Sequence, residues 1–126
     1  MSKTAITSPE LTPPVGPFSQ AIKVGGFIYF SGQIGQDPTT GKLVAGGLAA
    51  EAERIFQNLS AVLEAAGRSF DDVVRAGVYL TNISDFVAMN GIYAKHFNQP
   101  FPARTTIGVA ALPLGACVEI DLVVKA

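Results

Sequence analysis

The sequence predicts a two-layer α+β fold in the order ββαβαββ, a mostly antiparallel sheet with two helices on one face. Three observations support this: β-rich runs lie toward both ends, two segments of helical periodicity lie between them, and turn residues separate the segments. A chain of 126 residues can bury one core but hardly two. Residues 1–126 are therefore predicted to form a single domain.

The first half of the chain divides at its proline and glycine residues. Prolines between Pro9 and Pro17 predict an extended arm, because proline fixes φ and removes a hydrogen-bond donor. Residues 20–24 and 27–31 predict a hairpin. Apolar side chains then recur at three- and four-residue steps over residues 48–66, which is typical of an amphipathic helix. We expect Gly67 to end it in a left-handed conformation.

The second half begins with a β-branched strand at residues 73–80, followed by a second helix from an N-cap in 81–84 to about Phe97. Residues 104–112 and 117–125 are expected to pair as a final hairpin, because Leu112-Pro113-Leu114-Gly115 has the composition of a tight turn.

The last predicted strand alternates apolar and polar side chains, so one of its faces belongs to the core and Glu119 lies on the other. That second face of the sheet is expected to carry Tyr79 and Thr106 as well. Contact with another subunit is its expected cover.

Arg104 and Glu119 stand out because no ionisable side chain except the Cys117 thiol lies between them. In the expected hairpin, Glu119 is opposite about Gly108, which places it ~13 Å along the strand from Arg104. A small substrate cannot span that distance. If the two charges act together, a neighbouring subunit must complete the site.

Composition limits the classes of function. Hydrophobic residues make up 48% of the chain and charged residues only 15%, which favours burial of surface in an oligomer, since about a quarter is usual. A net charge of −1 disfavours nucleic-acid binding. The chain has one cysteine, no zinc-ligand spacing, no secretory signal and no apolar run of ~20 residues. These features predict a protein without membrane contact that is located in the cytoplasm or, alternatively, in an organelle.

Four groups of residues resemble the RidA family, also called YjgF. They are Gly16-Pro17-Phe18-Ser19-Gln20-Ala21, Ser31-Gly32-Gln33-Ile34, Asn90-Gly91-Ile92-Tyr93, and Pro102-Ala103-Arg104 with Glu119-Ile120. The resemblance implies a chorismate-mutase-like fold and a homotrimer with clefts between subunits. It also implies hydrolysis of enamine and imine intermediates, such as 2-aminoacrylate, to 2-oxo acids and ammonia without a cofactor.

The resemblance also assigns roles to single residues. Arg104 would bind the substrate carboxylate through two parallel hydrogen bonds, and Glu119 would hold the attacking water. Ser31 would complete the catalytic group. The predicted substrate-binding residues are Phe18, where many relatives have Tyr, and Gly32, Asn90 and Thr106.

Plainer interpretations stay open. Arg104 could form an inter-strand ion pair, and Glu119 could form a purely structural salt bridge of the trimer. Ser31 could be a turn residue, and Asn90 could be an ordinary helix-face amide. His96 is expected to be structural. The rival function is a non-catalytic trimer that binds 2-oxo acids as a sensor or acts as a holdase, and the missing hydroxyl at Phe18 keeps that alternative open. A ribonuclease is disfavoured, because the sequence offers no basic groove.

Overall fold

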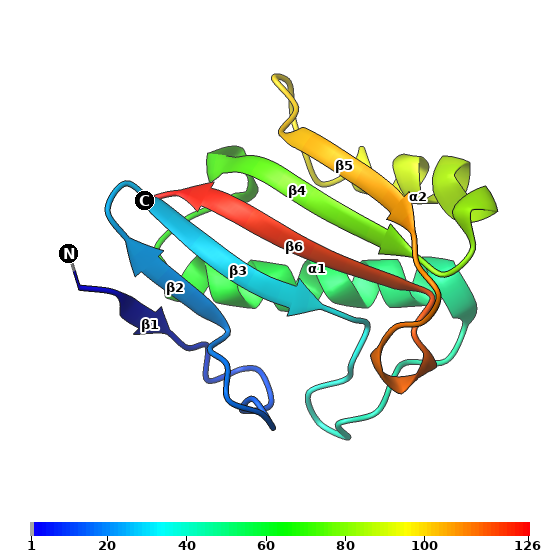
Figure 1. Ribbon diagram of the computed structural model, residues 1–126, viewed down its shortest axis with the longest axis horizontal. Helices are drawn as coiled ribbons and strands as arrows, with labels where there is room; N and C mark the ends of the chain where they lie inside the picture. Colours follow the sequence, from blue (N-terminus) through cyan, green and yellow to red (C-terminus); the bar gives the residue numbers. More distant parts are fainter. Residues whose placement is uncertain (1) are drawn as a thin grey trace.

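The computed structural model describes residues 2–126 as a six-stranded sheet with two α-helices packed on one face (Figure 1). The strands are β1 (Thr4–Ile6), β2 (Ala21–Val24), β3 (Phe27–Gln33), β4 (Val73–Leu80), β5 (Ala103–Gly108) and β6 (Val118–Lys125). The helices are α1 (Gly47–Ala65) and α2 (Phe86–Tyr93), and short 3-10 helices occupy Phe70–Asp72, Ile83–Asp85 and Pro113–Gly115. The predicted α+β class is confirmed.

The strand order is β1-β2-β3-β6-β4-β5. Neighbouring strands run antiparallel except β4 and β5, which are parallel. The predicted final hairpin is therefore wrong: β5 and β6 do not pair, because β4 lies between them. The segment after β5 continues along β4, where Val109 N–H donates to the Leu80 carbonyl, and the chain then crosses to the other side of β4 to begin β6.

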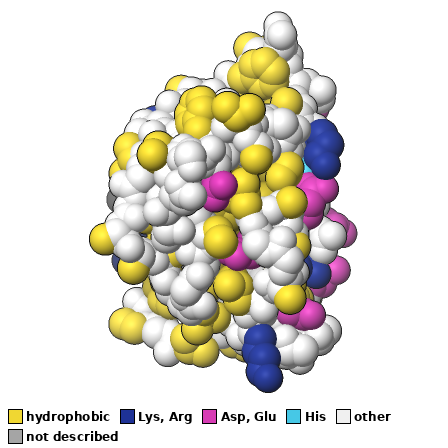
Figure 2. Space-filling model, turned by 90° about the vertical axis from the view of Figure 1, so that its right-hand side faces the viewer, with side chains coloured by type: hydrophobic (Ala, Val, Ile, Leu, Met, Phe, Trp, Pro, Cys, Tyr) yellow, Lys and Arg dark blue, Asp and Glu magenta, His cyan; other side chains and the backbone are white. Residues whose placement is uncertain are grey.

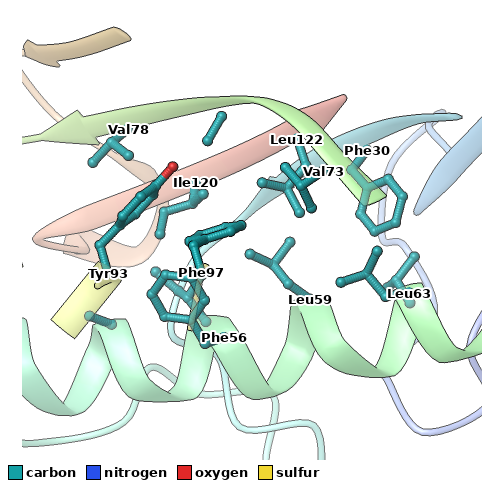
Figure 3. Close-up of a cluster of buried hydrophobic side chains, with 14 of the residues drawn as sticks. Phe30, Phe56, Leu59, Leu63, Val73, Val78, Tyr93, Phe97, Ile120 and Leu122 are labelled. Atoms are coloured by element: carbon teal, nitrogen blue, oxygen red, sulfur yellow. The ribbon is translucent and has the colours of Figure 1, made fainter. Parts of the chain in front are cut away.

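The core lies between the sheet and α1 (Figure 3). On β6 the predicted alternation is confirmed, because Val118, Ile120, Leu122 and Val124 are buried while Glu119 is only partly buried. The α1 side chains that meet this surface include Phe56, Leu59 and Leu63, each at most 1% exposed. No helix of the described part of the chain covers the opposite face of the sheet, and we call it the open face.

Helix α1 ends close to its predicted boundary, whereas α2 does not. Arg68 N–H donates to the Leu63 carbonyl and Gly67 N–H to the Glu64 carbonyl, and the φ of Gly67 is +69°, which is the left-handed stop expected of a glycine there. The second helix is shorter than predicted, since α2 ends at Tyr93 and hydrogen-bonded turns carry the chain on to His96.

The N-terminal arm contains a short strand, β1, that was not predicted. Thr4 to Ile6 pair with β2 before the first proline. Further along, Ser8 N–H donates to the Gln20 side chain at 2.7 Å, and both residues are buried. The arm is thus fastened to the edge of the sheet.

Large hydrophobic side chains are exposed at many places on the surface, which Figure 2 shows for one face of the molecule. Three of them lie on the open face: Phe27, Tyr29 and Ile107, each more than 40% exposed. No helix within residues 2–126 combines the length and the hydrophobicity that crossing a membrane would require.

Candidate functional site

Arg104 lies on the edge strand β5 and points to the helix side of the sheet. It is paired in register with Ala76, a core residue, and its Nη2 donates to Asn90 Oδ1 on α2. The guanidinium carbon lies 4.6 Å from the centre of the Tyr93 ring and 5.5 Å from that of Phe86. Neutral groups, an amide oxygen and two aromatic rings, therefore hold this cation.

Arg104 has no acidic partner within 4.0 Å among residues 2–126, whereas Lys95 and His96 both pair with Glu53. Within this chain the structural ion pair considered for Arg104 is absent. A pocket of about 320 Å³ opens beside the guanidinium. Its walls are otherwise mostly apolar and comprise Asn90, Tyr93, Ala94, Phe101 and Pro102.

Glu119 lies on β6 and points to the open face, as predicted. Burial raises the pKa of its carboxyl group, and the neighbouring Asp121 carboxylate raises it further. Asp121 projects from the same face two residues along and accepts a hydrogen bond of 2.9 Å from the Tyr79 hydroxyl. Glu119 has no ion-pair partner among the described residues, so the structural salt bridge considered for it would have to come from another subunit.

Ser31 and Gly32 form a β-bulge beside Glu119. Phe30 pairs with Leu122 and Gln33 with Ile120, so two residues of β3 oppose one residue of β6. The bulge brings Gly32 against Glu119: a methyl carbon added to Gly32 would lie 2.8 Å from Glu119 Cδ. The absence of a side chain at Gly32 thus leaves the space that the carboxylate fills.

The bulge also anchors the loop that carries Phe18. Ser31 Oγ donates to the Ser19 carbonyl at 2.6 Å, and Ser31 N–H donates to the Gln20 carbonyl. Phe18 itself is 55% exposed. The Ser31 hydroxyl proton is therefore engaged in fixing this loop, although its oxygen can still accept a hydrogen bond.

Thr106 lies on the helix side of β5, contrary to the expectation that it shares the open face with Tyr79. It is in register with the core residue Val78, and its Oγ1 is buried without a hydrogen-bond partner among the described residues. Its backbone follows Arg104 by two positions, so both side chains leave the strand on the same side.

The predicted site residues thus fall into two groups on opposite faces of the sheet. Arg104, Asn90 and Thr106 lie on the helix side, while Glu119, Gly32 and the loop bonded to Ser31 lie at the open face. Tyr79 on β4 pairs with Glu119 on β6 and with Ile107 on β5, so Glu119 and Ile107 are at the same level of the sheet. Ile107 is three residues beyond Arg104 on β5, and β6 is two strands away from β5. Strand geometry then gives a separation of about 14 Å.

His96 is structural, as predicted. Its ring stacks on Phe56 with 4.1 Å between centroids, and its Nε2 lies 3.0 Å from Glu53 Oε1. A larger pocket of about 580 Å³ between Phe70 and Pro102 contains none of the predicted site residues.

Two contributors to the site were not predicted as such. Tyr93 was named only as the last residue of the Asn90-Gly91-Ile92-Tyr93 motif, and Asp121 was given no role. For Tyr93 the signal was available, because a helix puts residues three apart on one face and so brings Tyr93 beside Asn90. For Asp121 the signal was its spacing of two from Glu119 on the same strand.

Comparison with known proteins agrees with this architecture. The family model described as endoribonuclease L-PSP matches residues 9–126. A 2-iminobutanoate/2-iminopropanoate deaminase of Dermatophagoides farinae is 46% identical over 98% of each chain, and the human protein of that name is 45% identical over 96% of this chain and 88% of its own. Among solved structures, RidA from an Antarctic Psychrobacter superposes with a TM-score of 0.92 at 43% identity, covering 98% of this chain and 99% of its own. The chain therefore belongs to the endoribonuclease L-PSP family, the family of RidA, to which its sequence motifs pointed.

Proposed function

We propose that this protein hydrolyses 2-imino acids and their enamine tautomers, the class of 2-iminopropanoate and 2-iminobutanoate, to 2-oxo acids and ammonia. The observation that carries the proposal is the guanidinium of Arg104, which is half-buried beside a mostly apolar pocket and has no carboxylate of residues 2–126 within 4.0 Å to neutralise it. The names of the two deaminase relatives support the same reaction.

Arg104 is proposed to bind the substrate carboxylate. A planar guanidinium has five N–H donors and can hold a carboxylate through two parallel hydrogen bonds. Since one donor is used by Asn90, enough remain for this bidentate contact. Asn90 thereby orients the clamp rather than contacting the substrate itself. The backbone around Thr106 and the mouth of the adjacent pocket would accommodate the rest of a small ligand.

Glu119 is proposed to hold and activate the water. An enamine first takes a proton on its β-carbon and becomes the protonated imine. Water then adds to the imine carbon while Glu119 removes a proton from the water oxygen. Glu119 returns that proton to nitrogen, and ammonia leaves as the C=O bond forms and the remaining hydroxyl proton passes to Glu119, which releases it to solvent. A carboxylate whose pKa is raised by burial is suited to these transfers.

The two halves of the site are proposed to meet between subunits of a homotrimer. Arg104 and Glu119 lie on opposite faces of one sheet, so a small substrate can contact both only if one of them comes from a neighbour. The exposed Phe27, Tyr29 and Ile107 on the open face would be buried by such an assembly. A trimer in dilute solution would support this, while a sedimentation mass near one chain would contradict it.

The reaction as proposed needs no cofactor, and Arg104 stands beside apolar rather than basic side chains, which argues against RNA as the substrate despite the family's description. A cytoplasmic location stays a prediction. The second candidate is a non-catalytic trimer that binds 2-oxo acids as a sensor, and the specific observation in its favour is Phe18, which cannot donate a hydrogen bond.

One assay separates these candidates. The protein is added to a threonine dehydratase reaction, and release of 2-oxo acid is timed against spontaneous hydrolysis. We expect acceleration by the wild type, none by Arg104→Ala, and undiminished acceleration by Arg68→Ala, which removes an exposed arginine at the end of α1. Binding of pyruvate without acceleration would favour the sensor, and an active Arg104→Ala protein would contradict the assigned clamp.

Complementation tests the shared site. Arg104→Ala and Glu119→Gln subunits are each expected to be inactive alone. The two variants are mixed 1:1 while unfolded and are then refolded, so that subunits assemble at random. If each site takes Arg104 from one subunit and Glu119 from the next, about one quarter of the interfaces then contain both intact residues. Recovery of about a quarter of the wild-type activity is therefore expected. No recovery in verified mixed trimers would place both residues' function within one chain.

A further inference from the structure

Arg104 is held in place almost entirely by side chains of α2. The guanidinium makes one hydrogen bond, to Asn90, and faces the rings of Tyr93 and Phe86. A single hydrogen bond leaves an arginine head free to turn about that contact. A flat surface beneath the guanidinium removes this freedom, because stacking keeps the two planes in contact.

Tyr93 is the better placed of the two rings. Its centroid is the nearer, at 4.6 Å against 5.5 Å for Phe86, and Tyr93 is 6% exposed whereas Phe86 is 40% exposed. Other aromatic rings fix the Tyr93 ring in turn, with Phe97 at 4.4 Å and Phe56 at 6.2 Å between centroids. A buried ring with such neighbours cannot swing away when a ligand binds.

The hydroxyl of Tyr93 takes no part in this contact. It is buried between the helix layer and the sheet, points toward the sheet in Figure 3, and has no hydrogen-bond partner among residues 2–126. Leaving a buried hydroxyl unpaired is unfavourable. The contacts described for Tyr93 are therefore those of its aromatic ring and not of its hydroxyl.

We propose that Tyr93 is a positioning residue for the carboxylate clamp: its ring face fixes the plane of the Arg104 guanidinium, so that the donors not used by Asn90 point at the carboxylate of the ligand. The proposal rests on the role given above to Arg104. It assigns the function to the aromatic face, so phenylalanine should replace tyrosine here and an aliphatic side chain should not.

The test is pyruvate binding, measured by calorimetry on the intact assembly for the wild type, Tyr93→Phe and Tyr93→Leu. We expect Tyr93→Phe to bind like the wild type and Tyr93→Leu to bind about tenfold more weakly, the scale of a partly desolvated cation–π contact. The matched control is Phe70→Leu, which removes a ring of the same cluster that packs on Phe56 and Phe97 rather than on Tyr93. It should lower the melting temperature as Tyr93→Leu does, without weakening pyruvate binding.

Three outcomes would overturn the inference: equal loss of affinity in Phe70→Leu and Tyr93→Leu, loss in Tyr93→Phe as large as in Tyr93→Leu, or no pyruvate binding by the folded wild type. If Tyr93→Leu does not fold, Tyr93→Met fills the cavity with a flexible side chain and replaces it in the comparison. Because binding is measured without turnover, a wild type that binds pyruvate through Arg104 and Tyr93 but does not hasten imine hydrolysis would refute the proposed deaminase and leave this inference standing.

Discussion

Gly32→Ala tests whether the position of the Glu119 carboxylate matters for activity. The added methyl carbon would lie 2.8 Å from Glu119 Cδ and 3.1 Å from Cγ, and nearer still to one carboxylate oxygen. The obstacle is the end of a side chain rather than backbone, so Glu119 can turn aside while the strand stays where it is. The φ of Gly32 is outside the left-handed region, so alanine fits the backbone.

The size of the effect follows from these contacts. Carbon atoms normally approach to about 3.5–4.0 Å, so the carboxylate must retreat by about 1 Å. Misplacement of a reacting group by about 1 Å can cost on the order of 100-fold in rate, or about 2.7 kcal/mol of barrier. The free energy of unfolding should change little, because replacing glycine in a compatible conformation stabilises by ~0.4–1 kcal/mol and offsets the local adjustment.

The measurement is the release of 2-oxo acid in the coupled dehydratase assay, together with thermal denaturation. Gly26→Ala is the control, because a methyl carbon there meets no atom within 4 Å and Gly26 lies in the β2–β3 turn. We expect it to keep full activity. Gly32→Ala activity within twofold of the wild type, with an unchanged melting temperature, would show that the carboxylate need not occupy this position.

Three further predictions concern the carboxylates and the loop. Phe18→Tyr should raise turnover severalfold, the scale of one net hydrogen bond of ~1 kcal/mol, while a switch from no activity to activity would favour the sensor. Glu119→Gln should melt at a higher temperature than the wild type at pH 7 and at the same temperature below about pH 4, since a raised folded pKa makes ionisation of Glu119 unfavourable to folding as pH rises; equal melting differences at both pH values would contradict this. Asp121→Asn should move the acidic limb of the pH–rate profile to lower pH, because the charge of Asp121 raises the pKa of Glu119. The Tyr79 hydroxyl, which donates to Asp121, can still donate to the amide oxygen of the variant. An unmoved limb would exclude Glu119 as the titrating base.

Sequence patterns could predict those parts of the fold that depend on neighbouring residues. The strand alternation of β6 is set by side chains two apart, and it placed Glu119 on the correct face. Gly67 ends α1 through its own left-handed φ. In both cases the interaction that decides the structure lies within a few residues of the pattern that predicts it.

The neighbours of β5 could not be predicted in this way. The Pro-Gly composition of residues 112–115 correctly indicates a turn, but a turn does not determine which strands pair. Leu114 adopts a left-handed φ of +58° within a 3-10 helix, at the end of a crossing that carries the chain over β4. Parallel pairing of β5 with β4 is decided by contacts remote in sequence. At this edge the run Thr105-Thr106-Ile107 has no clear alternation, which is why Thr106 was assigned to the wrong face.

The observed strand order separates Arg104 from Glu119 more completely than the predicted hairpin would. In a hairpin, Arg104 and Glu119 could have shared one face and been bridged by a longer ligand. In the observed sheet the two side chains lie on opposite faces and about 14 Å apart. At that distance the attraction between the two charges in water is only about 0.3 kcal/mol. Neither charge can therefore neutralise the other within a chain. Arg104 stays available for an anion and Glu119 for a water, and assembly would be the step that brings the two functions to one ligand.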